Sequence, residues 1–243
     1  MNDMTLGQCG SLLFQRCEKD EIESSIVEWH YSHNVNTITM YNFCLREPGG
    51  GLFGDRGRII AAVTFTIPVN RNQDDGMSLE LTRLVRCPEG HPDLKLSYMV
   101  SRSLRWIQHN TKYAIVVSYA DWTHGHHGGI YQACNFFYVG VSKQRVQGFS
   151  DADGNMIHKK TAYDKFGSSA VGLMRDEGYK PVIGKHKYLY VYPLAGKQKD
   201  KQAILDQRGY VPRRFPKPDW PDGMTPPDVD KETDHVLENT DQA

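Results

Sequence analysis

The sequence predicts a mixed α/β fold in which a mostly antiparallel sheet is flanked by helices. Residues 113–120 form a near-continuous apolar run, which is typical of a strand buried on both faces. Residues 58–69 are rich in β-branched side chains, which favours a second strand. Between them, residues 94–109 carry apolar side chains at helical spacing. A helix-linked pair of strands within a series of antiparallel strands indicates this mixed arrangement.

The segments that precede residue 94 are predicted to contain one helix and three strands. Apolar spacings of three and four, at Ile22, Ile26 and Trp29, predict a helix over 18–30. Strands are expected over 38–46, 58–69 and 78–86, and the glycine-rich segment 49–57 is expected to connect the first two as a hairpin.

The segments after residue 120 carry weaker signals. A polar turn is followed by a short predicted helix over 128–136. We further expect a hairpin over 149–160 around an Asp-Gly-Asn turn, a helix over 168–177 that ends at Gly178, and an alternating strand over 187–194. The sequence therefore predicts one domain over 1–197. It also predicts a tail over 198–243, first basic and then acidic and proline-rich, that is largely disordered.

Charge is distributed unevenly along the 243 residues, although the formal net charge is zero. Residues 219–243 hold eight acidic side chains and one lysine, so the preceding part of the chain carries a net charge of +7. A basic body fits a polyanionic partner such as double-stranded DNA, or tRNA, although an ordinary solvated surface gives the same count. The five cysteines lack CxxC spacing, and neither a signal peptide nor a membrane span is evident, so a cytoplasmic protein with reduced thiols is expected.

Two clusters of candidate functional residues lie in the first half of the chain. The first is E-W-H-Y-S-H, where His30 and His33 could share one helical face, and where His30 could exchange a proton at neutral pH. Histidines at the negative end of a helix dipole are the structural alternative. The second cluster is L-E-L-T-R-L, where strand alternation predicts Arg83 on one apolar face and Glu80 on the other. Arg83 needs a partner, either an acid such as Asp121 or a phosphate or carboxylate of a ligand.

The third cluster follows the predicted strand over 113–120 and is the richest. Its sequence, S-Y-A-D-W-T-H-G-H-H-G-G-I-Y-Q-A, runs from a buried strand through a turn into a helix. Ligands in open α/β sheets gather at the carboxyl ends of strands, and a helix start offers main-chain N–H groups to anions. Asp121 could orient a histidine or accept a proton from an amine, or it could cap the turn.

In their order along the chain, these motifs resemble the Mom family of phage DNA modification proteins. The resemblance covers E-W-H-Y-S-H, E-L-T-R-L, S-R-S-L-R-W, V-S-Y-A-D, H-G-H-H-G and I-Y-Q-A-C-N-F-F-Y-V-G, over about residues 20–142. It implies a fold similar to the GNAT acyltransferases and the addition of a glycine-derived carbamoylmethyl group to the exocyclic amine of adenine. The modified DNA then escapes host restriction, in the cytoplasm of the host cell. By motif position the resemblance places six residues in the active site: His30, Tyr31, Arg83, Ser118, Asp121 and Tyr131.

These residues suggest roles in such a reaction. The amine must be aligned and deprotonated while negative charge on the donor is stabilised. Asp121 or His30 could be the base, Tyr31 and Ser118 could serve the donor, and Arg83 could orient it. The expected substrate-binding residues are Trp29, His33, Glu80, Tyr119, Trp122, His124 and Tyr131, and the expected nucleic-acid contacts are Lys159, Lys160, Arg213 and Arg214.

The donor and two rival functions are left open by the sequence. GNAT enzymes bind coenzyme A at a glycine-rich turn, whereas residues 86–95 contain one glycine and two prolines, which lack N–H groups. This departure favours an aminoacyl (glycyl)-tRNA donor over acyl-CoA. The rivals are an acyltransferase for a small amine or protein, and a DNA enzyme with a metal such as iron bound by the histidines. The sequence is also compatible with a homodimer.

Overall fold

The computed structural model describes residues 5–36, 38–50, 56–70, 74–142, 146–184 and 186–217. The chain divides into two compact units, whereas the sequence predicted one domain up to residue 197. The first unit contains the described residues of Met1–Ala120, Gly128–Val139 and Leu189–Phe215. The second contains those of Asp121–His127, Gly140–Tyr188 and Pro216–Ala243. Within the described residues, no helix is long and apolar enough to cross a membrane.

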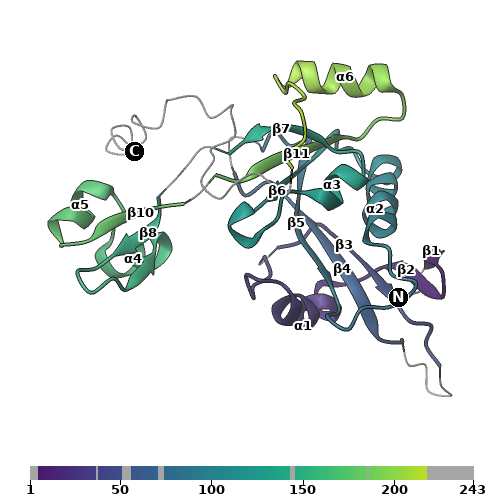
Figure 1. Ribbon diagram of the computed structural model, residues 1–243, viewed down its shortest axis with the longest axis horizontal. Coiled ribbons are helices and arrows are strands. Elements are labelled where there is room, and N and C mark those ends of the chain that lie inside the picture. The colour runs from purple at the N-terminus through teal and green to yellow at the C-terminus, as the bar shows by residue number, and fades with distance from the viewer. Residues whose placement is uncertain are drawn as a thin grey trace. The chain divides into compact units, whose positions relative to one another are not determined.

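An eight-stranded sheet forms the centre of the first unit, with the strand order β1-β2-β3-β4-β5-β6-β11-β7 (Figure 1). Strands β1 to β5 pair antiparallel with their sequence neighbours, and β5 pairs parallel with β6. The predicted mixed and mostly antiparallel fold is therefore confirmed. The strands are β1 Thr5–Cys9, β2 Leu12–Arg16, β3 Tyr41–Arg46, β4 Ile59–Thr66, β5 Ser78–Arg86, β6 Ile115–Ala120, β7 Phe137–Val141 and β11 Tyr188–Pro193.

Helices α1 (Lys19–Trp29) and α2 (Leu96–Asn110) cover opposite faces of strands β3 to β5 (Figure 1). Ile22 and Ile26 of α1 pack on Cys44, Ala62 and Val85. The neighbouring strand residue, Phe43, points to the other face and meets Trp106 of α2 with ring centroids 5.6 Å apart. Because side chains alternate along a strand, one apolar stripe on each helix is enough to bury both faces of the sheet.

Two further helices complete the first unit. Helix α3 (Gly129–Ala133) follows the turn after β6 and is shorter than the predicted 128–136. Helix α6 (Gln198–Gln207) lies within the segment that the sequence predicted as a disordered tail. Its fully buried Leu205 packs on Ile115, Val117 and Val191 of the sheet, so tertiary packing stabilises a helix whose own sequence is mostly polar. The acidic residues 219–243 lie outside the described residues.

The second unit contains a three-stranded sheet in the order β10-β8-β9, with β8 Val146–Ser150, β9 Met156–His158 and β10 Lys180–Ile183. The β8–β9 pair confirms the predicted hairpin around the Asp-Gly-Asn turn. Helices α4 (Lys159–Phe166) and α5 (Val171–Asp176) pack beside this sheet. Its small core combines Val146 and Phe149 with Ala162, Val171 and Met174.

The start of α3 depends on a glycine. Gly128 has a φ of 84°, in the left-handed region, and a Cβ atom there would collide with the ring of Tyr190. Gly125 has a φ of 73°, and a Cβ atom there would meet nothing within 4 Å. The two glycines therefore share a backbone requirement and differ in close packing.

Replacing each glycine by alanine should separate these two effects. We expect Gly125→Ala to lower the free energy of unfolding by about 1–2 kcal/mol, the usual cost of a left-handed alanine. Gly128→Ala should cost at least about 1 kcal/mol more, because Tyr190 must also move. Urea denaturation of both variants measures this difference. Equal losses for the two variants would show that the contact with Tyr190 is not tight.

Candidate active site

Strands β5 and β6 part in the middle of the sheet. Their parallel pairing joins Ser78–Leu81 to Ile115–Ser118 and ends there, although β5 continues to Arg86 and β6 to Ala120. At the same level β5 has a β-bulge, because Phe65 of β4 pairs with Leu81 while Thr64 pairs with Arg83. Thr82 is the extra residue, and such bulges often redirect side chains beside active sites.

The bulge corrects the predicted faces of β5. Thr66 and Thr64 lie on one face of β4, and their partners are Glu80 and Arg83. Glu80 and Arg83 therefore share a face, whereas simple alternation had placed them on opposite faces. Glu80 is 8% exposed, and one of its carboxylate oxygens accepts the main-chain N–H of Val69 at 2.9 Å. Glu80 is thus a buried carboxylate.

The half-buried Arg83 connects β5 to the loop that follows α1. Its Nε donates to the carbonyl oxygen of Asn34 and its Nη1 to that of Thr82, both at 2.7 Å. Burial lowers the pKa of the guanidinium, and the nearby Tyr31 and Glu80 raise it in part. Both of these contacts are to main-chain carbonyls of the first unit, and among the described residues of that unit Arg83 forms no ion pair. Main-chain carbonyls, which are neutral acceptors, hold the guanidinium group in place. Its positive charge therefore suits a ligand phosphate or carboxylate.

Ser118 and Tyr131 form a buried hydrogen-bonded chain where β5 and β6 part. Ser118 is fully buried, and its hydroxyl donates to the carbonyl of Leu81 at 2.9 Å. Tyr131 of α3 hydrogen-bonds to Ser118. Burial raises the pKa of Tyr131 to about 12, while the bond from Ser118 opposes the rise. Tyr131 is therefore a neutral hydroxyl at physiological pH, suited to donating a hydrogen bond and not to acting as a base.

The histidines after α1 do not share a helical face, contrary to the prediction. The helix ends at Trp29, so His30 is its extended C-cap residue and His33 lies in the loop with a φ of 44°. His30 Nδ1 accepts the main-chain N–H of Ser32, which places the proton of the neutral ring on Nε2. His33 Nδ1 lies 2.8 Å from the carbonyl of Val27, which can only accept, so His33 carries its proton on Nδ1. Tyr31 is 43% exposed and packs against His30, with ring centroids 4.3 Å apart.

Asp121 belongs to the second unit, as the first residue of the turn after β6. It is 8% exposed, and its carboxylate pairs with Lys187 Nζ at 2.9 Å. Its carbonyl accepts the N–H groups of His124 and His126, which stabilises a short 3₁₀ helix over Trp122–His124. Asp121 therefore both shapes the turn, as the structural alternative proposed, and presents a buried carboxylate. His124 is exposed, and Trp122 is half-buried.

The remaining candidates are spread over both units. In the first unit, Trp29 and Tyr119 are half-buried, and Arg213 and Arg214 are exposed on the segment after α6, where the N–H of Arg213 bonds to the carbonyl of Tyr138. In the second unit, Lys159 and Lys160 are exposed at the start of α4. Within the part of the chain that the structure describes, no three histidine, cysteine or acidic side chains are arranged to hold a metal ion.

Three participants were not found from the sequence. Thr82 supplies the bulge, Asn34 supplies a main-chain acceptor to Arg83, and Lys187 pairs with Asp121. A main-chain carbonyl leaves no mark in the side-chain sequence. Lys187, which begins an alternating strand segment, had a visible signal in its charge, and Thr82 had one in the break of strand alternation beside Arg83.

Comparison with known proteins gives similar solved structures and a family. Solved structures similar to it include N-acetyltransferases, each with 10% sequence identity. An acetyltransferase of the GNAT family from Bacillus anthracis has a TM-score of 0.43, with 77% of this chain and 97% of that chain covered. The spermidine/spermine N-acetyltransferase SpeG from Vibrio cholerae has a TM-score of 0.42 (82% and 97% covered), and the ribosomal-protein-S18-alanine N-acetyltransferase from Escherichia coli has one of 0.41 (76% and 96%). TM-scores of this size carry no argument about activity.

The family is given by the sequence itself. The family model of the Mom protein family matches residues 11–217, which include every candidate site residue named above. The chain belongs to the Mom protein family. No curated protein sequence matches it significantly.

The state of Tyr131 can be tested by titration. The ¹³Cζ resonance of Tyr131 should stay unchanged between pH values of about 9 and 11, where ordinary tyrosines ionise. Because its folded pKa lies above the unfolded value, the stability it contributes is complete below about pH 10 and is lost as the pH rises through about 12. Ser118→Ala removes a bond that lowers this pKa, so the resonance should remain silent in that variant. A midpoint near pH 10 for Tyr131 would refute its burial and neutral state.

Proposed function

We propose that this protein is a DNA-modifying transferase that adds a glycine-derived carbamoylmethyl group to the exocyclic amine of adenine, and so protects phage DNA from host restriction. The family match over residues 11–217 carries this proposal. Additional support comes from the polar side chains Tyr31, Glu80, Arg83 and Tyr131, which influence one another electrostatically within the first unit.

The donor half of the reaction is assigned to this group. The developing negative charge on a donor carbonyl needs a hydrogen-bond donor that is itself neutral or positive. Tyr131 is a neutral hydroxyl because burial raises its pKa, and Arg83 is a fixed cation whose fork suits a phosphate or carboxylate. A glycyl-tRNA donor fits the proposal better than acyl-CoA, since the prolines at 88 and 92 lie in the connection between β5 and α2.

The acceptor half requires a base and a way to reach the adenine. The exocyclic nitrogen must lose a proton as its new bond forms, and Asp121 or His30 could accept that proton. In a duplex the amine is hidden by base pairing, so the adenine must be flipped out or met in a single strand. The exposed ring of Tyr31, already packed on His30, is suited to stack on an extruded base.

Nucleosides from cells that express the protein test this reaction. We expect a modified deoxyadenosine in their DNA and protection against restriction enzymes whose sites contain adenine. Attack of the amine on the glycyl ester carbonyl breaks the ester bond, releases the tRNA hydroxyl and forms the glycyl amide of adenine. This amide is an isomer of the carbamoylmethyl product, so the proposal requires a rearrangement after transfer, and fragmentation by mass spectrometry must distinguish the two. Unmodified deoxyadenosine in cells with abundant folded protein would overturn the proposal. Loss of activity on chelation, with stoichiometric metal in the purified protein, would favour the metal-dependent rival.

Binding of DNA should depend steeply on salt, because part of the chain carries a net charge of +7. A protein that neutralises about six phosphates loses roughly three decades of affinity between 50 and 200 mM salt. The double replacements Arg213→Ala with Arg214→Ala, and Lys159→Ala with Lys160→Ala, should each flatten the slope of log affinity against log salt by about 0.9 per lost contact. Lys19→Ala with Lys112→Ala serves as the matched control. Slopes that are the same in all variants would show that neither basic pair contacts DNA.

A further inference from the structure

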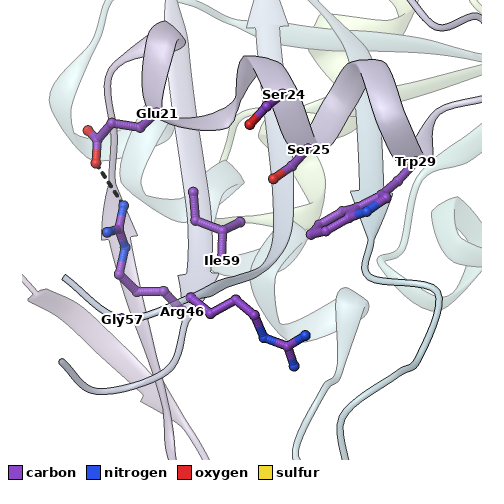
Figure 2. A pocket seen from close by; sticks show the side chains of 8 residues that line it. Glu21, Ser24, Ser25, Trp29, Arg46, Gly57 and Ile59 are labelled. Carbon is purple, nitrogen blue, oxygen red and sulfur yellow. Dashed lines mark hydrogen bonds and ion pairs between the residues drawn. The ribbon is translucent and has the colours of Figure 1, made fainter. Parts of the chain in front are cut away.

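A pocket of about 380 Å³ lies in the first unit between α1 and the start of β4 (Figure 2). Ser24, Ser25 and Trp29 of α1 form one wall. Figure 2 shows Ile59 facing them from the sheet, with Arg46 reaching up to Glu21. Arg58 also lines the pocket. The volume lies at the lower end of the range for small-ligand sites.

Glu21, the one carboxylate among the described residues that line this pocket, is fully engaged. Glu21 Oε1 accepts the main-chain N–H of Glu18 at 2.8 Å, and Oε2 accepts both Arg46 at 2.7 Å and Arg56 at 2.8 Å. Burial alone would raise the pKa of Glu21, but these hydrogen bonds outweigh it and hold the pKa below its usual value. Two guanidinium groups thus share one carboxylate.

The other polar groups of the pocket are hydrogen-bond donors that the described residues engage only in part. Arg46 is 3% exposed, and its buried Nε has no hydrogen-bond partner among the described residues. Arg58 reaches only the exposed carboxylates of Glu47, at 3.6 Å, and Glu89, at 4.0 Å, which makes both pairs weak. In the described part of the chain, the hydroxyls of Ser24 and Ser25 have no hydrogen-bond partner either. A surface of hydrogen-bond donors that includes the guanidinium groups of two arginines favours an anion.

The half-buried indole of Trp29 narrows the class of anion. It is a flat aromatic face at the edge of the pocket, opposite the aliphatic Ile59 (Figure 2). A planar heterocycle can stack on such a face while an attached phosphate reaches the arginines. The pocket volume is large for a phosphate alone and suits one nucleotide unit.

We propose that this pocket binds a single nucleotide unit, with its phosphate held by Arg58, Arg46 and the serine hydroxyls and its base on Trp29. The phosphate replaces the carboxylates of Glu47 and Glu89 as the partner of Arg58. Trp29 is followed directly by His30 and Tyr31, so a bound nucleotide lies beside the loop that carries two candidate active-site residues. The inference does not depend on the proposed reaction, because it rests on this pocket alone.

Titration of the full-length protein with AMP tests the proposal. The ¹H–¹⁵N resonance of the Trp29 indole, assigned with Trp29→Phe, should shift as AMP is added at millimolar concentration. Adenosine and inorganic phosphate should each bind about tenfold or more weakly than AMP, because each retains half of the contacts. Arg58→Gln should weaken AMP binding by at least about tenfold.

Matched variants separate this site from others. Arg175→Gln changes an exposed arginine of α5 in the second unit and should leave AMP binding unchanged. Arg83→Lys should also leave it unchanged, so failure of the proposed reaction and failure of this site are distinguishable. AMP binding that Arg58→Gln does not affect, or an indole resonance of Trp29 that does not move, would overturn the proposal.

Discussion

One inserted residue, Thr82, determines which side chains β5 can present where it leaves β6. Without the bulge, Glu80 and Arg83 would lie on opposite faces of the sheet. With it, both lie on the face covered by α1, and Arg83 reaches the main-chain carbonyl of Asn34 in the loop after that helix. Asn34 lies three residues after Tyr31. Because Arg83 of β5 binds the Asn34 carbonyl, the geometry of β5 helps to position the loop that carries His30 and Tyr31.

On the β6 side of the place where β5 and β6 separate, the buried polar groups are neutral. Ser118 is fully buried, and its bond to the Leu81 carbonyl lies at the last pair of the β5–β6 ladder. Tyr131 continues that chain of hydrogen bonds from α3, whose start requires the close approach of Gly128 to Tyr190. A fixed cation on one strand and a neutral hydroxyl on the neighbouring helix form a pair suited to a substrate that becomes negative as it reacts.

The sequence predicted the elements of this arrangement better than their contacts. The bounds of β5 were predicted correctly, and β6 and α2 were predicted to within two residues at each end. Strong apolar periodicity identifies such segments because each must bury a continuous stripe. Short or polar elements such as β1, β2, β7, β10, α4 and α6 escaped prediction, since tertiary packing and not local pattern stabilises them.

The composition of the site could be predicted, but its geometry could not. Polar and apolar residues alternate over S-L-E-L-T, and the two adjacent polar residues Thr82 and Arg83 interrupt this pattern where the bulge lies. The simple alternation assumed for the whole strand therefore placed Arg83 on the wrong face. The spacing of His30 and His33 suggested one helical face, but the helix ends between Trp29 and His30. The partners of Arg83 are main-chain carbonyls, and Asp121 pairs instead with a lysine 66 positions later in the chain.

The replacement Arg83→Lys tests most directly whether the active site lies where β5 and β6 separate. A lysine keeps the charge but cannot donate to both Asn34 and Thr82 as the guanidinium fork does. Arg86→Lys, on the same strand but exposed, is the matched control. We expect Arg83→Lys to stay folded in thermal melting while modified deoxyadenosine, measured by mass spectrometry at equal expression, falls about 100-fold, the scale of losing an important transition-state contact. Normal modification by folded Arg83→Lys, or an equal loss in Arg86→Lys, would contradict the account.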